Sequence, residues 1–142
     1  MDTVTALKLT SSGAMKVLEA AIEEAQKAGF SVCAAVVDDG GNLLAFSRMD
    51  GAELYSVPIS IAKARGAAWT RFPTGKKSPS GNVRDDHHAI AITLAAGPDN
   101  FVSMPGGVPI TLNGQVIGAV SVSGAGHSDQ KLAEAAAAVL GK

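Results

Sequence analysis

The stretch VPITLNGQVIGAVSVS, residues 108–123, decides the fold. It consists of two runs rich in β-branched residues on either side of Asn113-Gly114. Asn-Gly is a preferred centre of a type I′ turn, because both positions of that turn need a positive φ. The stretch therefore predicts a β-hairpin with strands over 108–112 and 115–123.

A second hairpin is expected earlier in the chain. The apolar run VCAAVV, residues 32–37, is followed by DDGGN at 38–42 and by LLAF at 43–46. Gly, Asp and Asn supply the backbone conformations of a tight turn. Because the first run lacks polar alternation, we expect a central strand that is buried on both faces. Residues 101–104 are expected to add an edge strand.

Capping residues and helical spacing predict helices around these hairpins. In chain order, they are a helix capped by Thr10 or Ser11 and ended by Gly29, one capped by Ser56 that stops before Pro73, one over Arg84–Ala95, and a closing helix capped by Ser128 and Asp129. Two antiparallel sheet pieces separated by helices predict one sheet with helices packed on it, an α+β fold.

Length and composition indicate a single domain over residues 1–142. Hydrophobic residues make up 46% of the chain, many of them alanine, so we expect a homo-oligomer that covers part of this surface. The formal charge of −1 gives no basic field for nucleic acid or an anionic membrane. No secretory leader pattern or stretch of about 18 apolar residues is present, so we expect a cytoplasmic protein.

Four segments in order carry a family resemblance. They are VVDDGGNLLAFSRMDGA at 36–52, KAR at 63–65, PGGVPI at 105–110 and NGQVIGAVSVSG at 113–124. The chain resembles the GlcG/HbpS-like family, which includes the C-terminal domain of PduO proteins. The resemblance implies a profilin-like fold, with a five-stranded antiparallel sheet flanked by helices, and assembly into oligomers. Several members of the family bind haem, some are linked to haem degradation, and one branch is similar to a lyase acting on 4-hydroxylaminobenzoate.

His87 and His88 are the first candidates for chemistry. Imidazole is a common haem and metal ligand and a common acid or base near neutral pH. Adjacent side chains point in different directions, so we expect at most one of the two to enter a given site. His127 precedes the closing helix, where a loop role is the simpler interpretation.

Lys63 and Arg65 lie two residues apart on the second expected helix and therefore face different directions. One can reach a pocket while the other pairs with a surface carboxylate. A guanidinium fork suits a carboxylate, which a haem propionate or a benzoate would offer. We expect a ligand contact from at least one of them.

Two further groups are candidate binding or catalytic residues. Pro105-Gly106-Gly107 can expose backbone N–H groups to an anion, or simply make a sharp turn into the sheet. Glu53 and Tyr55 lie in a loop between hairpin and helix, where acid–base or ligand-binding groups are often held.

Two functions of different class follow, and the sequence leaves open whether the chain is an enzyme. The first is a small-ligand-binding protein, with His87 or His88 on a haem iron and Lys63 or Arg65 on a propionate. Haem is the one cofactor that the resemblance implies. The alternative is a cofactor-independent lyase or isomerase on a small aromatic acid, with Glu53 or a histidine moving protons.

Overall fold

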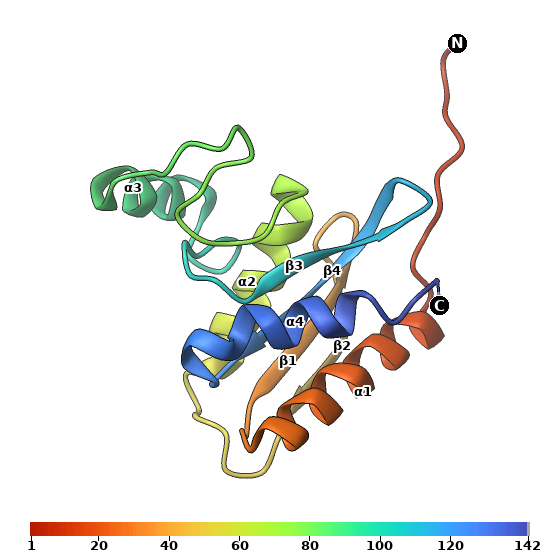
Figure 1. The fold of residues 1–142 in the computed structure, drawn as a ribbon. Coiled ribbons are helices and arrows are strands. Elements are labelled where there is room, and N and C mark those ends of the chain that lie inside the picture. Colours follow the sequence, from red (N-terminus) through yellow and green to blue (C-terminus); the bar gives the residue numbers. More distant parts are fainter. Residues whose placement is uncertain (142) are drawn as a thin grey trace.

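The computed structural model describes residues 1–141, which fold into one antiparallel sheet with helices on both faces (Figure 1). The sheet has four strands in the order β2-β1-β4-β3. The elements are α1 (Ser11–Ala28), β1 (Cys33–Asp38), β2 (Leu43–Arg48), α2 (Ser56–Thr70), α3 (Asp86–Ala96), β3 (Gly107–Leu112), β4 (Gln115–Ser123), a 3-10 turn (Gly126–Ser128) and α4 (Asp129–Ala137). The α+β expectation is confirmed.

Both predicted hairpins are present. β3 pairs with β4 across Asn113 and Gly114, whose φ angles of 50° and 75° suit the expected turn. β1 pairs with β2 on one side and with β4 on the other, so it is the central strand that its apolar run predicted. Residues 33–37 of β1 are completely buried.

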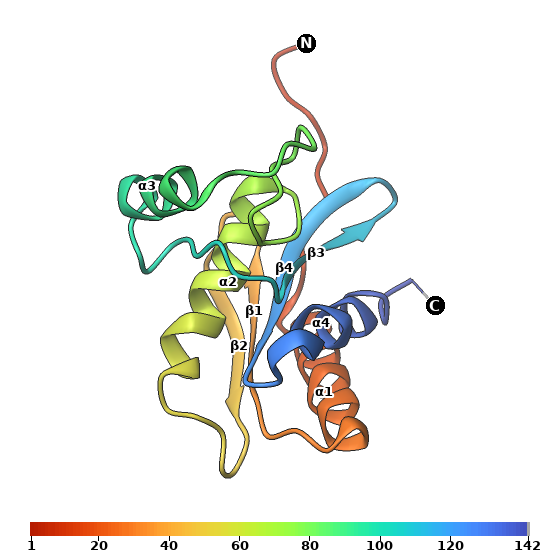
Figure 2. The same ribbon diagram turned by 60° about the vertical axis from the view of Figure 1, so that its left-hand side comes forward.

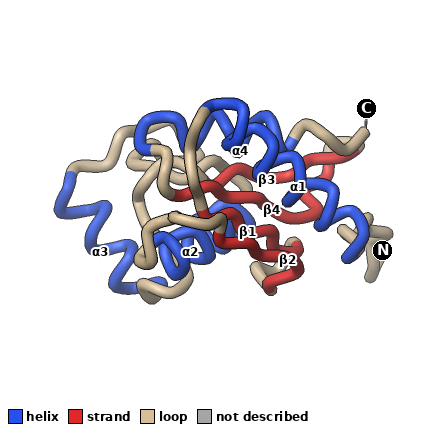
Figure 3. Tube along the Cα trace, turned by 90° about the horizontal axis from the view of Figure 1, so that it is seen from below, coloured by secondary structure: helices blue, strands red, loops and turns tan. Residues whose placement is uncertain are grey.

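The helices form two layers around the sheet. α1 and α4 cover one face, and α2 lies on the other (Figure 3). The α2 side is packed with small side chains, including Ala64, Ala67 and Ala68 from the helix against Ala35 and Ala119 from the sheet. Because these side chains are short, α2 lies close to β1 and β4.

The predicted fifth strand is absent from residues 1–141. Residues 101–104 cross α2 instead of pairing with a sheet edge (Figure 2). Phe101 is buried against Gly66 of α2, where an added Cβ would lie 2.9 Å from the Phe101 ring. The Thr74 hydroxyl holds the same segment by donating to the Met104 carbonyl over 2.7 Å. Packing of one aromatic ring on a helix therefore replaces the expected edge strand.

Two helix starts differ from the expected caps. Ser56 is the first residue of α2 rather than its cap, and its side chain is buried. Ser128 makes no capping hydrogen bond, and the Asp129 carboxylate instead accepts from the Ala125 N–H. The other ends agree with expectation, since Thr10 caps α1 and Gly29 ends it in a left-handed conformation.

α3 projects from the rest of the domain on two long connections (Figures 1 and 2). Its side chains Ile90 and Leu94 are 61% and 70% exposed, and Ala89 is the buried residue of the helix. No helix within residues 1–141 has both the length and the apolar character to cross a bilayer.

Candidate functional site

A buried ion pair between α2 and α4 lies at the centre of the site. Lys63 is 3% exposed, and its ammonium lies 3.0 Å from a carboxylate oxygen of Asp129. The ammonium also donates to the Val122 carbonyl over 3.1 Å, and the second Asp129 oxygen accepts from the Ala125 N–H over 2.7 Å. Burying two charges is tolerable only when both are paired and hydrogen-bonded, as they are here.

The glycine pair Gly106-Gly107, at the start of β3, packs directly against Lys63. A Cβ on Gly106 would lie 2.8 Å from the Lys63 ammonium and 2.6 Å from the Val122 carbonyl oxygen. A Cβ on Gly107 would overlap the Lys63 carbonyl. Gly106 also has a φ of 130°, which L side chains rarely adopt. The Pro105-Gly106-Gly107 segment is thus a close backbone approach to the ion pair.

Two adjoining cavities open around this ion pair, and we call them together the Lys63 cleft. One, of about 210 Å³, is bounded by Glu53 and Tyr55. The other, of about 390 Å³, is bounded by Pro105, His127 and Gln130. Lys63, Met104, Gly126 and Asp129 line both. Pockets of a few hundred cubic ångströms with a few convergent polar groups are typical of small-ligand sites.

Glu53 and Tyr55 form the outer wall of the cleft. A hydrogen bond to Glu53, together with its negative charge, raises the pKa of Tyr55 above its usual value. A smaller contribution in the same direction comes from the charge of Asp129. The shift extends to higher pH the range in which the phenol is protonated and can donate a hydrogen bond.

Buried serines continue the polar lining beneath this wall. The Ser123 hydroxyl donates to the Ser56 hydroxyl over 3.2 Å, and both residues line the smaller cavity. Ser56, Ser123 and Asp129 were not among the predicted site residues. The sequence signalled Ser56 and Asp129 only as helix caps, because no local pattern shows that α2, β4 and α4 meet at one point.

The other predicted site residues lie elsewhere. Arg65 donates to the carbonyls of Gly41 and Asp99 over 3.2 and 3.1 Å, so it joins α2 to the β1–β2 turn and to the loop after α3. His87 and His88 are exposed in the first turn of α3, outside the residues that line the Lys63 cleft. His127, for which a loop role was expected, is the histidine that borders the cleft.

Metal binding by protein side chains alone has no support in residues 1–141. That part of the chain contains no group of three or more His, Cys, Asp or Glu residues arranged to hold an ion. The cleft instead offers an ammonium, a carboxylate, an imidazole and hydroxyl groups around a small cavity. This set of groups suits recognition of a small polar or carboxylated molecule.

Comparison with known proteins agrees with this architecture. A family model described as "Haem degrading protein HbpS-like" matches residues 9–138. Protein GlcG of Escherichia coli (strain K12) is 44% identical over 120 residues, which is 84% of each chain. A double mutant of Streptomyces reticuli HbpS is 34% identical with a TM-score of 0.81, over 99% of this chain and 92% of that one. PduOC in complex with haem shares the fold, at 23% identity and a TM-score of 0.78, over 93% of this chain and 94% of that one. Because the family model matches nearly the whole length of the chain, the chain belongs to the HbpS-like family.

Proposed function

We propose that this chain is a small-ligand-binding protein that binds haem in the Lys63 cleft. The observation that carries the proposal is that a buried ammonium, with the Gly106 backbone packed against it, and an exposed imidazole border one cavity. The family description, which names haem, supports the choice of ligand.

The residues of the cleft fit a haem group in kind. His127 and Met104 both border the larger cavity, and imidazole and thioether are side chains that ligate haem iron. The Lys63 side chain lines both cavities, and its amino group is a hydrogen-bond donor that would suit a propionate. When bound, haem would supply a redox-active iron.

His87 and His88 remain the alternative iron ligands. Both are exposed on α3, so either one would bind haem at the surface of that helix rather than in the cleft. The chain contains three histidines, and each can be replaced separately. The position of the haem therefore follows from which replacement removes the iron ligand.

The test is a titration of the purified protein with hemin, read by its Soret absorbance. We expect saturable binding that His127→Ala weakens strongly and that His87→Ala and His88→Ala leave unchanged. Loss of the Soret shift in His87→Ala or His88→Ala alone would show that the haem binds at α3 and not in the Lys63 cleft. A wild-type response that is linear and never saturates would refute haem binding altogether.

We propose a second function on a specific observation, the small cavity that Glu53 and Tyr55 line together with the Lys63–Asp129 pair. This arrangement suits a cofactor-independent lyase or isomerase acting on a small aromatic acid such as 4-hydroxylaminobenzoate. Lys63 would attract the carboxylate of the acid, and Glu53 would transfer a proton.

The second function is tested by incubating the haem-free protein with 4-hydroxylaminobenzoate and following its consumption by chromatography. If the proposal is correct, Glu53→Gln lowers the turnover by about 10² to 10⁴. The matched variant Glu23→Gln, at an exposed position of α1, has no effect. No turnover by the wild-type protein would remove this substrate from consideration.

A further inference from the structure

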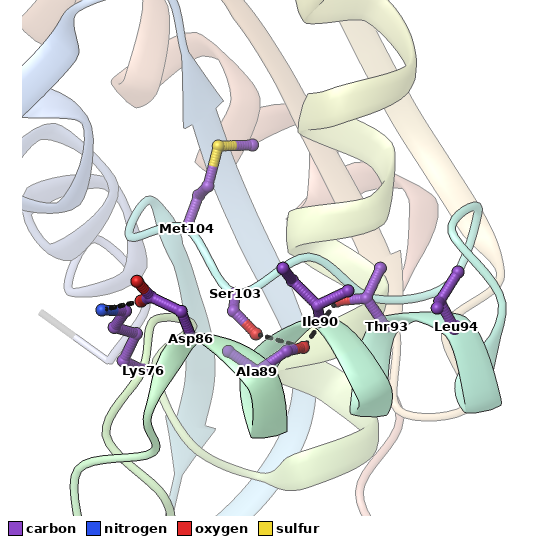
Figure 4. A pocket seen from close by; sticks show the side chains of 8 residues that line it. All are labelled: Lys76, Asp86, Ala89, Ile90, Thr93, Leu94, Ser103 and Met104. Carbon is purple, nitrogen blue, oxygen red and sulfur yellow. Dashed lines mark hydrogen bonds and ion pairs between the residues drawn. The ribbon is translucent and has the colours of Figure 1, made fainter.

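A third cavity lies beyond the Lys63 cleft, between α3 and the segment that returns from it (Figure 4). Its volume is about 370 Å³, and one face of α3 forms its longest wall through Asp86, Ala89, Ile90, Thr93 and Leu94. These positions recur at the three- and four-residue spacing of a single helix face. Met104 lines this cavity as well as the cleft, so its side chain lies between the two.

The wall of this cavity is apolar because its hydroxyl groups are already satisfied. The hydroxyls of Thr93 and Ser103 both donate to the Ala89 carbonyl, over 3.2 and 3.3 Å (Figure 4). They therefore offer no free donor proton to an incoming molecule. What remains for a ligand are the side chains of Ile90, Leu94 and Met104.

Charge is found at one end of this cavity. Lys76 pairs with Asp86, the first residue of α3, and the hydrogen bond and positive charge of Lys76 lower the pKa of that carboxyl (Figure 4). The side chains of Lys76 and Asp86 are 50% and 80% exposed. An exposed pair of this kind contributes little to stability, so an anion can take the place of the carboxylate.

We propose that the cavity between α3 and residues 103–104 is a binding site for an apolar acid, a molecule with a hydrophobic body and one anionic group. The body contacts Ile90 and Leu94, and the anionic group pairs with Lys76. This site is separate from the cleft to which we assign haem, and it does not depend on that assignment.

Two fluorescent probes that differ in charge test the proposal. 8-Anilinonaphthalene-1-sulfonate has an apolar body and a sulfonate, whereas N-phenyl-1-naphthylamine has a similar body and no charge. Leu94→Gln is expected to weaken both probes about tenfold or more, because it removes a leucine contact. The matched Ala95→Gln replaces the neighbouring exposed residue, outside the cavity lining, and is expected to leave both affinities unchanged.

The charge assignment has its own pair of variants. Lys76→Gln is expected to weaken the sulfonate probe by about two- to fivefold and to leave the uncharged probe unaffected. Lys77→Gln, the adjacent lysine outside this cavity, is expected to change neither. Far-UV circular dichroism verifies the fold of each variant, and Ile90→Gln replaces Leu94→Gln if the latter is unfolded.

Three outcomes would overturn the proposal. Equal effects of Leu94→Gln and Ala95→Gln would show that the probes bind elsewhere. Equal effects of Lys76→Gln on the two probes would remove the role of the anionic group. Probe binding that disappears as light scattering reports self-association would mean that a second copy of the chain covers the cavity.

Discussion

From the sequence, Lys63 and Arg65 were the two basic residues predicted to contact a ligand. The helical spacing shows that Lys63 and Arg65 diverge, but not which of them faces the sheet side of α2. That choice depends on packing, because Ala64, Ala67 and Ala68 form the side of the helix that lies against the sheet. Its partner Asp129 is 66 residues away in sequence, and no local pattern predicts a pair at that distance.

Removing the charge of Lys63 should strongly destabilise the folded protein. Lys63→Met leaves the Asp129 carboxylate buried without a cation, so we expect a loss of about 3 to 5 kcal/mol in the free energy of unfolding, measured with urea. Adding Asp129→Asn should recover about 1 kcal/mol or more, since the amide oxygen still accepts from the Ala125 N–H. The control is Lys27→Met, which breaks an exposed pair with Glu24 and should change stability by less than about 1 kcal/mol. Similar losses in Lys63→Met and Lys27→Met would contradict the account.

Asp38 should make a stability contribution that depends on pH. Burial alone would raise the pKa of this carboxyl, but hydrogen bonds from Asn42 and Gly40 and the charge of Lys8 hold it below its ordinary value of 3.8. The stabilisation is therefore complete above that value and is lost as the pH falls through the folded-state pKa.

The measurement for Asp38 is urea unfolding at neutral and acidic pH. We expect Asp38→Ala to lower the free energy of unfolding by about 1 to 2 kcal/mol at pH 7, and the difference from wild type to shrink as the carboxyl becomes protonated. Asp50→Ala, at an exposed position, should change stability by less than about 0.5 kcal/mol. A difference for Asp38→Ala that stays constant with pH would argue against the carboxylate as its source.

At the scale of elements, the hairpins were predictable because turn chemistry is local. Asn113-Gly114 specifies its own turn, and the buried run of β1 specifies a central strand. Residues 101–104 were assigned wrongly as a strand, because their place depends on Phe101 fitting against a glycine of α2. The sequence shows that Phe101 is apolar, but it does not show that Phe101 packs on α2.

Replacing Gly66 by alanine should destabilise the protein, which is opposite to the usual effect of this substitution within a helix. Within a helix, Gly→Ala normally stabilises by about 0.5 to 1 kcal/mol. At this position the new methyl would lie 2.9 Å from the Phe101 ring, so we expect Gly66→Ala to destabilise by about 1 to 3 kcal/mol.

A double-mutant cycle with Phe101→Leu isolates this contact. The smaller side chain leaves room for the methyl group, so the cost of Gly66→Ala should fall in that background. Gly66→Ala that stabilises the wild-type protein would show that Phe101 does not pack on α2 as described.

At the scale of the whole molecule, the order of the expected helices and hairpins predicted an α+β fold, and the structure agrees for residues 1–141. The sequence also predicted a helix over 84–95, close to α3, but not that it would project from the domain. From Ala89 onward its residues are apolar except for Thr93, which is typical of a buried helix. The position of α3 depends on two long connections rather than on a pattern within the helix.

Homo-oligomer formation remains a prediction from the composition of the chain. Leu54, which precedes α2, and Trp69, near the end of α2, are both half or more exposed, and such side chains are commonly covered by a partner. We expect light scattering to report a mass of at least twice the 14.3 kDa of one chain. A mass of one chain at every concentration would contradict this expectation.

The central claim is that the ligand binds in the Lys63 cleft, and nuclear magnetic resonance tests it most directly. The measurement is the change in amide shifts of the labelled protein on adding gallium(III) protoporphyrin IX, a diamagnetic analogue of haem. We predict the largest changes at Lys63, Gly106, Gly126 and His127, which surround the cleft. Changes confined to His87, His88 and the rest of α3, with the cleft amides unmoved, would contradict the account.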